Sequence, residues 1–448
     1  MRWRSWGKDT VAANVAGLAL LSFIVAAGFS AGNLLLPYLV LALEGILKAL
    51  PEKLTMINAS RAAIEVGGLV TAFMAARAFV AAASGWLSDK LGRKPLIVSG
   101  VMLYAASTAL YYRASSIPVL LLLRGIQGVS SAMTWPVAET LLMDSVPPLA
   151  RTRAMSIYVV SFNLGNVVGP LLGSAAYAAA LRLLGPGMSV TEAFQAPFLL
   201  LALLAAPAIP VALMLRDPGA GKEHHAASEA MRRFTGGLLE LPAAVKRALK
   251  GFYANALLNG IAVGIVSSIL ILYIIQYIAR TPEAVGTLLA IPGFAGMLAA
   301  YPAARRLDRM SDEARLAVLV ASATTSRLIL ASLGFIRSTL AFVAALTAMN
   351  VLFNILLPLM RSLEAGLVPS RLRGRVFGLH QAMFNIGMTI GPLIGSWIYE
   401  AYGSVEILPG VTGAQAVFLL AGLLGLAGVP LIALLYRPAA VREAWEKG

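Results

Sequence analysis

Long apolar runs alternate with short polar breaks along almost the whole chain. Each run holds about eighteen residues or more, enough for a helix rising about 1.5 Å per residue to cross about 30 Å of hydrocarbon. The pattern therefore predicts an all-α polytopic membrane protein with twelve transmembrane helices, at 11–42, 60–84, 95–113, 118–143, 154–181, 193–215, 252–279, 284–304, 315–335, 339–362, 375–400 and 412–436.

The one long polar break divides these spans into six and six. It begins RDPGAGKEHH and ends in an amphipathic stretch from Leu238 to Leu249. We expect an N-terminal six-helix bundle at 1–215, a cytoplasmic central linker at 216–250 and a C-terminal six-helix bundle at 251–448. The first apolar run is about twice the length of the hydrophobic region of a signal peptide, so we expect it to remain as the first span.

Composition and charge support this assignment. Hydrophobic residues make up 59% of the chain and charged residues 13%, against about 45–50% and 25% in soluble proteins. Most of the 36 Lys and Arg residues lie in segments that are cytoplasmic if both termini are cytoplasmic. The net charge of +15 is then an orientation signal that also attracts anionic lipid, and its spread over separate segments argues against nucleic-acid binding. We expect a multi-pass protein of the plasma membrane.

Residues that carry chemistry are scarce. The chain has no Cys and three His, which excludes disulfides, thiolate nucleophiles and Cys-ligated metals. His224 and His225 lie in the central linker, and His380 lies alone in the eleventh span. We expect no metal, no cofactor and no enzyme activity, because no constellation of nucleophile, base or metal ligands is visible.

Two segments in the two halves resemble each other. RAMSIYVVSFNLGNVVGPLLGS at 153–174 aligns without gaps with RVFGLHQAMFNIGMTIGPLIGS at 375–396. Such repeats are typical of transporters, whose substrate site lies near the bilayer midplane between the halves. The shared frame predicts close helix packing at Gly165, Gly169, Pro170 and Gly173, and at Gly387, Gly391, Pro392 and Gly395.

Three short motifs resemble signatures of the major facilitator superfamily. GWLSDKLGRK at 85–94 is similar to the loop between spans two and three, RGIQG at 124–128 to span four, and GNVVGPLLG at 165–173 to the span-five motif most often found in its antiporters. The second copy of the loop is degraded to ARRLDRMSDE at 304–313. The resemblance covers essentially the whole chain and implies the twelve-span drug/proton antiporter branch, two pseudo-symmetric bundles, a small-molecule substrate, protons as coupling ion and a monomer.

The charged loop after span two is the first candidate site. The resemblance implies that Asp89 faces a helix end of the opposite half and that Arg93 pairs with Asp144, so that the loop latches the halves in one state. Gly85 and Gly92 would allow close helix approach and a tight turn. The alternative is that the basic residues of this loop only fix the topology.

Polar side chains within the spans are the second set of candidates, because intramembrane charges usually mark a pathway or an internal pair. At 100° per residue, a stripe of polar and aromatic residues from Arg124 to Glu139 falls on one face of span four, and we expect this face to line a cavity. Arg77 is expected to point into the bundle and pair with Glu139. The alternative is that it reaches towards the cytoplasmic interface of the membrane.

For Asn163 and Asn385, substrate contact and interhelical hydrogen bonding both remain open. His380 could titrate near neutral pH or have a structural role. Arg327 is expected to snorkel towards the membrane interface. The cavity or coupling residues are Arg77, Arg124, Ser131, Trp135, Glu139, Asn163, Asn166, Asn350, Asn354, His380 and Asn385.

The repeat also predicts a gate. Extending the alignment backwards pairs Glu139 with Arg361, near the cytoplasmic ends of spans four and ten. We expect an ion pair between the halves that holds the outward-facing state. The local alternatives pair Arg361 with Glu364, or Glu139 with Arg77.

The functional expectation is a secondary active transporter that exports a small organic or drug-like compound in exchange for protons. Uptake or facilitated diffusion of a polar metabolite is the alternative within transport. A transporter-like receptor or scaffold is the alternative outside it.

Overall fold

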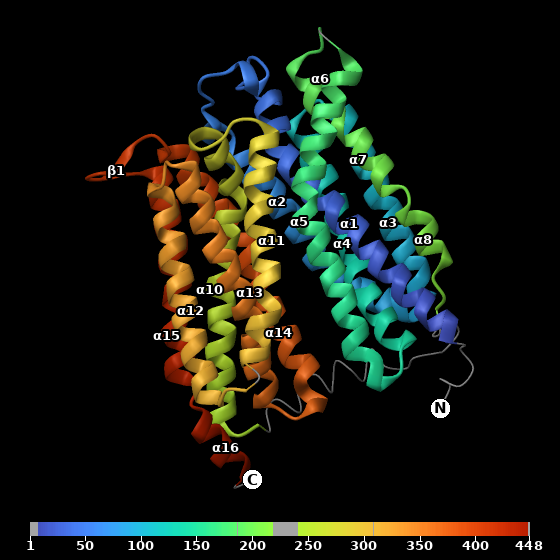
Figure 1. The fold of residues 1–448 in the computed structure, drawn as a ribbon, viewed down its shortest axis with the longest axis vertical. Coiled ribbons are helices and arrows are strands. Elements are labelled where there is room, and N and C mark those ends of the chain that lie inside the picture. The colour runs from blue at the N-terminus through green and yellow to red at the C-terminus, as the bar shows by residue number, and fades with distance from the viewer. Residues whose placement is uncertain (1–7, 186, 218–240, 308, 447–448) are drawn as a thin grey trace. The chain divides into compact units, whose positions relative to one another are not determined.

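The computed structural model describes residues 8–185, 187–217, 241–307 and 309–446, and these are mostly helical (Figure 1). The chain divides into two compact units. The first unit comprises Met1–His224 and Ile274–Ala290, and the second unit comprises His225–Tyr273 and Ile291–Gly448. Residues Ile274–Ala290 therefore belong to the first unit, although they lie in the second half of the sequence.

The first unit contains the first six spans. Its sixth span is broken twice, beside Pro197 and Pro207, because proline lacks the amide that a continuous helix needs. Single 3-10 turns lie at Pro51–Lys53, Ala59–Ala62, Tyr111–Arg113 and Pro148–Ala150. The helices are α1 (Lys8–Leu43), α2 (Ala63–Leu91), α3 (Arg93–Leu110), α4 (Ile117–Ser145), α5 (Arg151–Leu184), α6 (Val190–Gln195), α7 (Pro197–Ala205) and α8 (Ala208–Met214).

The second unit contains most of the remaining helices and a small hairpin. Antiparallel strands β1 (Glu406–Leu408) and β2 (Val411–Thr412) form the hairpin, and a 3-10 turn lies at Leu333–Phe335. The helices are α10 (Ala243–Tyr277), α11 (Pro282–Leu307), α12 (Asp312–Ser332), α13 (Thr339–Leu367), α14 (Ser370–Tyr402), α15 (Gly413–Leu435) and α16 (Pro438–Glu446).

The predicted all-α membrane fold is confirmed. Eleven spans in the described parts of the chain are long and apolar enough to cross a bilayer. The remaining predicted span, 375–400, lies within α14, which at 33 residues is also long enough. A helix satisfies its own backbone hydrogen bonds, which is what hydrocarbon demands of a spanning segment.

The expected central linker differs from the structure at its end. Residues 243–250, AAVKRALK, form the first turns of α10 and do not belong to a separate segment, because Ala, Lys, Arg and Leu are all strong helix formers. Residues 218–240 lie outside the described residues. The expected domain boundaries stay a prediction.

Local capping fixes several helix ends. Ser189 and Glu192 bond reciprocally at the start of α6, and Thr412 and Gln415 do the same at the start of α15. Such capping boxes satisfy amides that the first helical turn leaves without partners. Gly92 separates α2 from α3 with φ of +90°, a conformation that side chains other than glycine rarely adopt.

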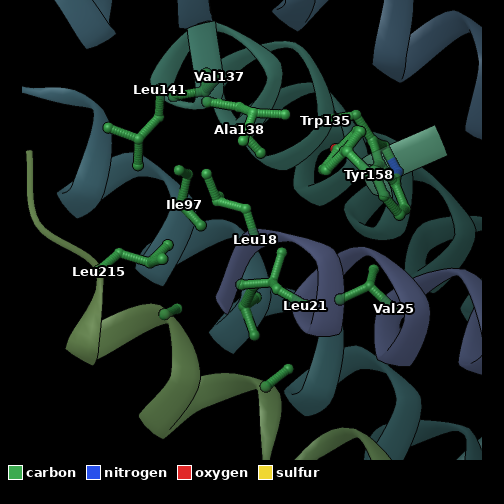
Figure 2. Close-up of a cluster of buried hydrophobic side chains, with 14 of the residues drawn as sticks. Leu18, Leu21, Val25, Ile97, Trp135, Val137, Ala138, Leu141, Tyr158 and Leu215 are labelled. Carbon is green, nitrogen blue, oxygen red and sulfur yellow. The ribbon is translucent and has the colours of Figure 1, made fainter. Parts of the chain in front are cut away.

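A buried apolar cluster holds the first unit together (Figure 2). It joins helices that are far apart in the sequence, since α1, α3, α4 and α5 all contribute to it. Figure 2 labels Leu18, Leu21, Val25, Ile97, Trp135, Val137, Ala138, Leu141, Tyr158 and Leu215.

Glycines of the repeated motif lie at two equivalent helix contacts. In the first unit α5 packs on α1, where a Cβ on Gly173 would lie 2.8 Å from the carbonyl oxygen of Ala31. In the second unit α14 packs on α10, where a Cβ on Gly395 would lie 2.9 Å from the Cα of Ile265. Both contacts bring backbones so close that a larger residue has no room. The duplicated sequence thus produces the same packing twice.

Candidate transport and proton sites

The charged loop between α2 and α3 is held by an ion pair and hydrogen bonds within the first unit. Arg93, the first residue of α3, forms an ion pair with Asp144 near the end of α4. The carboxylate of Asp217 accepts hydrogen bonds from the backbone amides of Arg93 and Lys94, at 2.6 and 3.3 Å. An anion is favourable there because the helix N-terminus carries partial positive charge.

Two other residues of this loop, Gly85 and Asp89, were expected to lie where helices come into contact. A Cβ on Gly85 would meet no described atom within 4 Å, and the expected close helix approach at Gly85 stays a prediction. The side chain of Asp89 lies outside the described residues, and its contact with the opposite half stays a prediction.

Arg124 lies inside the first unit with 6% of its surface exposed. Its guanidinium donates to the side-chain oxygen of Asn33 on α1 and, at 2.9 Å, to Oε1 of Gln127. It also lies 5.5 Å from the ring centre of Phe73. No Asp or Glu lies within 4 Å of it in the described parts of the chain. Neutral side chains alone therefore solvate this buried cation.

The stripe expected along span four is covered in its middle. Ser131 is 0% exposed and Trp135 is 8% exposed, with Trp135 edge-on to Phe162 of α5 at 4.8 Å. Both side chains are therefore buried and do not line an open cavity in this structure, and Phe162 of α5 covers Trp135. Glu139 is exposed and close enough to Arg77 on α2 for the two charges to interact.

The asparagines of the repeated motif make mainly local contacts. Asn166 donates to the carbonyl of Phe162 at 3.1 Å, and Asn163 is half-buried. Asn385 accepts a hydrogen bond from Gln381 at 3.0 Å. The choice between substrate contact and interhelical bonding stays open for Asn163.

The asparagines of span ten bond back to their own helix. Asn350 donates to the carbonyl of Leu346 at 3.0 Å, and Asn354 to that of Asn350 at 2.9 Å. Helix α11 covers both, since a Cβ on Gly296 would lie 2.7 Å from the amide nitrogen of Asn354. Neither residue is among the described residues that line the cavity of the second unit.

That cavity has a volume of about 220 Å³ and lies among α10, α12, α13, α14 and α15. Its walls are largely aliphatic and aromatic, which suits the body of an organic molecule. The polar residues that line it are Asn255, Asn259, Arg327, Arg361, His380 and Gln381.

A buried acid and histidine lie at the edge of this cavity. Oε1 of Glu364 on α13 is 2.5 Å from Nδ1 of His380 on α14, and the two residues are 0% and 5% exposed. The other oxygen of Glu364 lies 3.5 Å from Arg361, which also stacks 5.1 Å from the ring centre of Phe377. His380 is therefore not isolated, and the local alternative for Arg361 is present.

Arg327 points into the bundle. Its guanidinium donates to Asn259 on α10 and its stem crosses α15 at Gly425, where a Cβ would lie 2.5 Å from Nε. The expected snorkelling of Arg327 is therefore wrong. An interhelical hydrogen bond holds the charge beside the cavity instead.

The expected gate joins residues of different units. Glu139 belongs to the first unit and Arg361 to the second. Their pairing stays a prediction.

Three residues that line the cavity were missed from the sequence: Asn255, Asn259 and Gln381. Glu364 was expected only as a local partner of Arg361, three residues before it on the same helix. It fell beyond the predicted end of span ten, 362, whereas α13 continues to Leu367. Asn255 and Asn259 share a face four residues apart in an otherwise apolar span, which was the available signal.

A family model matches nearly the whole chain. The model for the Major Facilitator Superfamily matches residues 18–254 and 252–448. The chain belongs to the Major Facilitator Superfamily. Members of this family are transporters and not enzymes, and this facilitator is accordingly a multi-pass membrane transporter.

Relatives of this facilitator include proteins named for multidrug resistance. It is 30% identical over 125 residues to putative multidrug resistance protein MdtD of Pectobacterium atrosepticum, covering 28% of this chain and 26% of the relative. It is 25% identical over 325 residues to multidrug resistance protein MdtG of Klebsiella pneumoniae, covering 71% and 73%. The alignment thus spans about a quarter of the first relative.

Solved structures share the fold. The nucleoside transporter NupG matches with a TM-score of 0.69 at 14% identity, and the match covers 95% of this facilitator and 100% of NupG. At this identity the likeness describes the fold alone.

Proposed function

We propose that this facilitator exports a small organic or drug-like compound in exchange for protons, and that the cavity of the second unit binds the compound. The observation that carries this proposal is the buried pair of Glu364 and His380, 2.5 Å apart, at the edge of a largely apolar cavity. A carboxylate and an imidazole in contact can hold one proton between them. His380 itself lines the cavity, so a bound compound and a bound proton would affect each other directly.

The charges around Glu364 and His380 would favour binding of the proton and the compound in turn. Arg361 lies 3.5 Å from Glu364, and Tyr253 on α10 lies close enough to interact with it electrostatically. Adding a proton raises the net positive charge of a group that already contains a guanidinium, and burial makes such a charge costly. Binding of the compound and release of the proton can then alternate, as antiport requires.

The names of the relatives support the direction of transport. MdtD and MdtG are described as multidrug resistance proteins. Export of organic compounds is the function that those names describe, and the apolar wall of the cavity suits such compounds.

The test uses purified protein in liposomes with a panel of organic compounds in the outer buffer. An antiporter accumulates its substrate when the lumen is more acidic than the outer buffer, because protons leave as the substrate enters. A proton symporter accumulates it only under the opposite gradient, and facilitated diffusion responds to neither. Accumulation under the acidic lumen, abolished by a protonophore, is the expected result. Equal uptake under both gradients would contradict proton coupling.

A further inference from the structure

We propose that the cavity of the second unit selects compact organic anions, and that Arg327 binds their negative charge. This inference rests on the proposed function only in taking the cavity as the compound's binding site. It adds a chemical class, compact organic anions such as arylcarboxylates, that the family model and the multidrug-resistance names of MdtD and MdtG do not assign.

The charge of the cavity wall is one-sided. Arg327 and Arg361 both line the cavity with their guanidinium-bearing side chains, and His380 adds an imidazole. No Asp or Glu is among the described residues that line it. A small, poorly solvated space with this lining favours anions over cations, because like charges repel strongly where water is scarce.

The two arginines are not equivalent. Arg361 already has an acidic neighbour, Glu364 at 3.5 Å. Arg327 has no Asp or Glu within 4 Å in the parts of the chain that the structure describes. A guanidinium inside a membrane bundle is costly without a counter-charge. An anionic ligand would therefore neutralise the charge of Arg327.

The hydrogen bonds of Arg327 leave room for such a ligand. One terminal nitrogen donates to Oδ1 of Asn259, and the other donates to the hydroxyl of Ser326 over a long 3.4 Å. Its Nε is buried and makes no hydrogen bond to any described residue. Buried donors are normally satisfied. Planar carboxylates match two guanidinium donors at once, which makes them the best-fitting partners.

The position of Arg327 depends on a glycine. A Cβ on Gly425 of α15 would lie 2.5 Å from Nε of Arg327, so a larger residue would push the side chain away from α15. Asn259 holds the other end of the guanidinium from α10, and Asn255 in turn accepts from Asn259 at 2.8 Å. Three helices thus fix the charge in place, as a preorganised binding group requires.

Size limits the body of the ligand. An apolar protein cavity of about 150 Å³ holds a benzene ring, so the 220 Å³ here fits one ring with a carboxylate and little more. Phe353, Phe384 and Met360 lie in the wall. Aromatic and thioether side chains of this kind pack well against a flat ring.

The experiment measures binding by isothermal titration calorimetry to the full-length protein in a neutral detergent. Three probes with planar head groups of nearly the same shape differ in charge: 4-ethylbenzoate, 4-ethylbenzamide and 4-ethylbenzamidinium. We expect the benzoate to bind wild type about tenfold or more tighter than either other probe, as a charge-assisted hydrogen bond should provide. Arg327→Gln should remove this preference, and Arg327→Lys should retain part of it.

Arg337→Gln is the matched control, because Arg337 is an exposed arginine of the same unit that does not line the cavity. It should bind the benzoate as wild type does. Size-exclusion profiles of all variants report folding. Equal binding of the three probes, no binding of any, or an unchanged preference in Arg327→Gln would overturn the proposal.

A lipid phosphate carries the same charge as a carboxylate. Adding short-chain phosphatidylglycerol should leave the benzoate affinity unchanged, and competitive displacement would assign the site to lipid and overturn the proposal. Failure of proton coupling is distinguishable from these outcomes. Anion binding without gradient-driven accumulation would contradict only the proposed export, whereas gradient-driven accumulation restricted to cationic compounds would contradict only the anion site.

Discussion

The carboxylate of Glu364 on α13 touches the imidazole of His380 on α14, with 2.5 Å between Oε1 and Nδ1. Neither residue is more than 5% exposed. The contact joins two consecutive helices inside the second unit at the edge of its cavity. A proton placed there changes the charge next to a bound compound, which is how one transport event could depend on the other.

The first prediction removes the acid of this pair. Glu364→Gln keeps the shape of the side chain but cannot carry a negative charge. We expect gradient-driven accumulation in liposomes to fall about tenfold or more, as losing about 1.4 kcal/mol from a step would cause. Exchange of labelled for unlabelled substrate, which moves no net protons, should persist.

Glu44→Gln is the control, because Glu44 is an exposed carboxylate in the loop after α1. It should leave both measurements unchanged. If Glu364→Gln still accumulates substrate under a pH gradient as wild type does, Glu364 does not couple transport to protons. Glu139 would then be the next residue to test.

Much of the cavity site of the second unit could not be predicted from the sequence, for a physical reason. Hydropathy locates spans by their apolar centres, so a charged residue near a predicted end, such as Glu364, is assigned to a loop. Arg327 was misplaced because a snorkelling arginine and an interhelical one have the same sequence pattern, and only the glycine at 425 and the asparagine at 259 decide between them. Those partners lie on other helices, and their spacing from Arg327 carries no local signal.

The second prediction concerns Arg93 and Asp144. The pair is partly open to solvent, with side chains 13% and 41% exposed, and exposed pairs contribute only about 0.2–1 kcal/mol. Arg93→Ala and Asp144→Ala should therefore change the melting temperature little. Each should still lower the transport rate markedly if the pair forms in only one of the two states.

The charge reversal provides the sharper measurement. Arg93→Asp combined with Asp144→Arg should recover part of the rate that each reversal alone removes, and a double-mutant cycle isolates that coupling. Arg153→Ala, an exposed arginine in the first turn of α5, serves as the control. Additive losses without recovery would show that the two residues act separately.

The third prediction tests the gate between Glu139 and Arg361. Within its own unit Arg361 already contacts Glu364 at 3.5 Å and Gln381 at 3.4 Å, so the gate requires it to exchange partners. The chain has no cysteine, and Glu139→Cys with Arg361→Cys therefore reports on this contact alone. We expect cross-linking under conditions that trap the outward-facing state.

Glu139→Cys with Glu406→Cys is the control pair, since the predicted topology places Glu406 on the other side of the membrane. Cross-linking is expected to be absent there. An absence of cross-linking between 139 and 361 under the same conditions would remove the gate and leave the local pairs as their only roles.

The fold was far more predictable than the site. Each span is specified by its own residues, because a helix in hydrocarbon must satisfy its own backbone. The repeated G-x-x-x-G-P-x-x-G frame also indicated where helices would pack closely. Ends were less predictable, as at α10, because residues such as Lys246 and Arg247 are polar and strong helix formers at once.

The last prediction uses two glycines of the same helix. A Cβ on Gly391 of α14 would lie 2.9 Å from the amide nitrogen of Ile265 and 3.0 Å from the Cα of Gly264, whereas a Cβ on Gly378 would meet nothing within 4 Å. Backbone atoms cannot move aside as a side chain can, so Gly391→Ala should cost about 1–3 kcal/mol of unfolding free energy. Gly378→Ala should instead add about 0.5–1 kcal/mol, since alanine stabilises a helix relative to glycine. Melting temperatures of the detergent-solubilised variants should therefore move in opposite directions. Equal shifts would mean that α14 and α10 separate slightly to admit the methyl group, and that their close contact is not what stabilises the second unit.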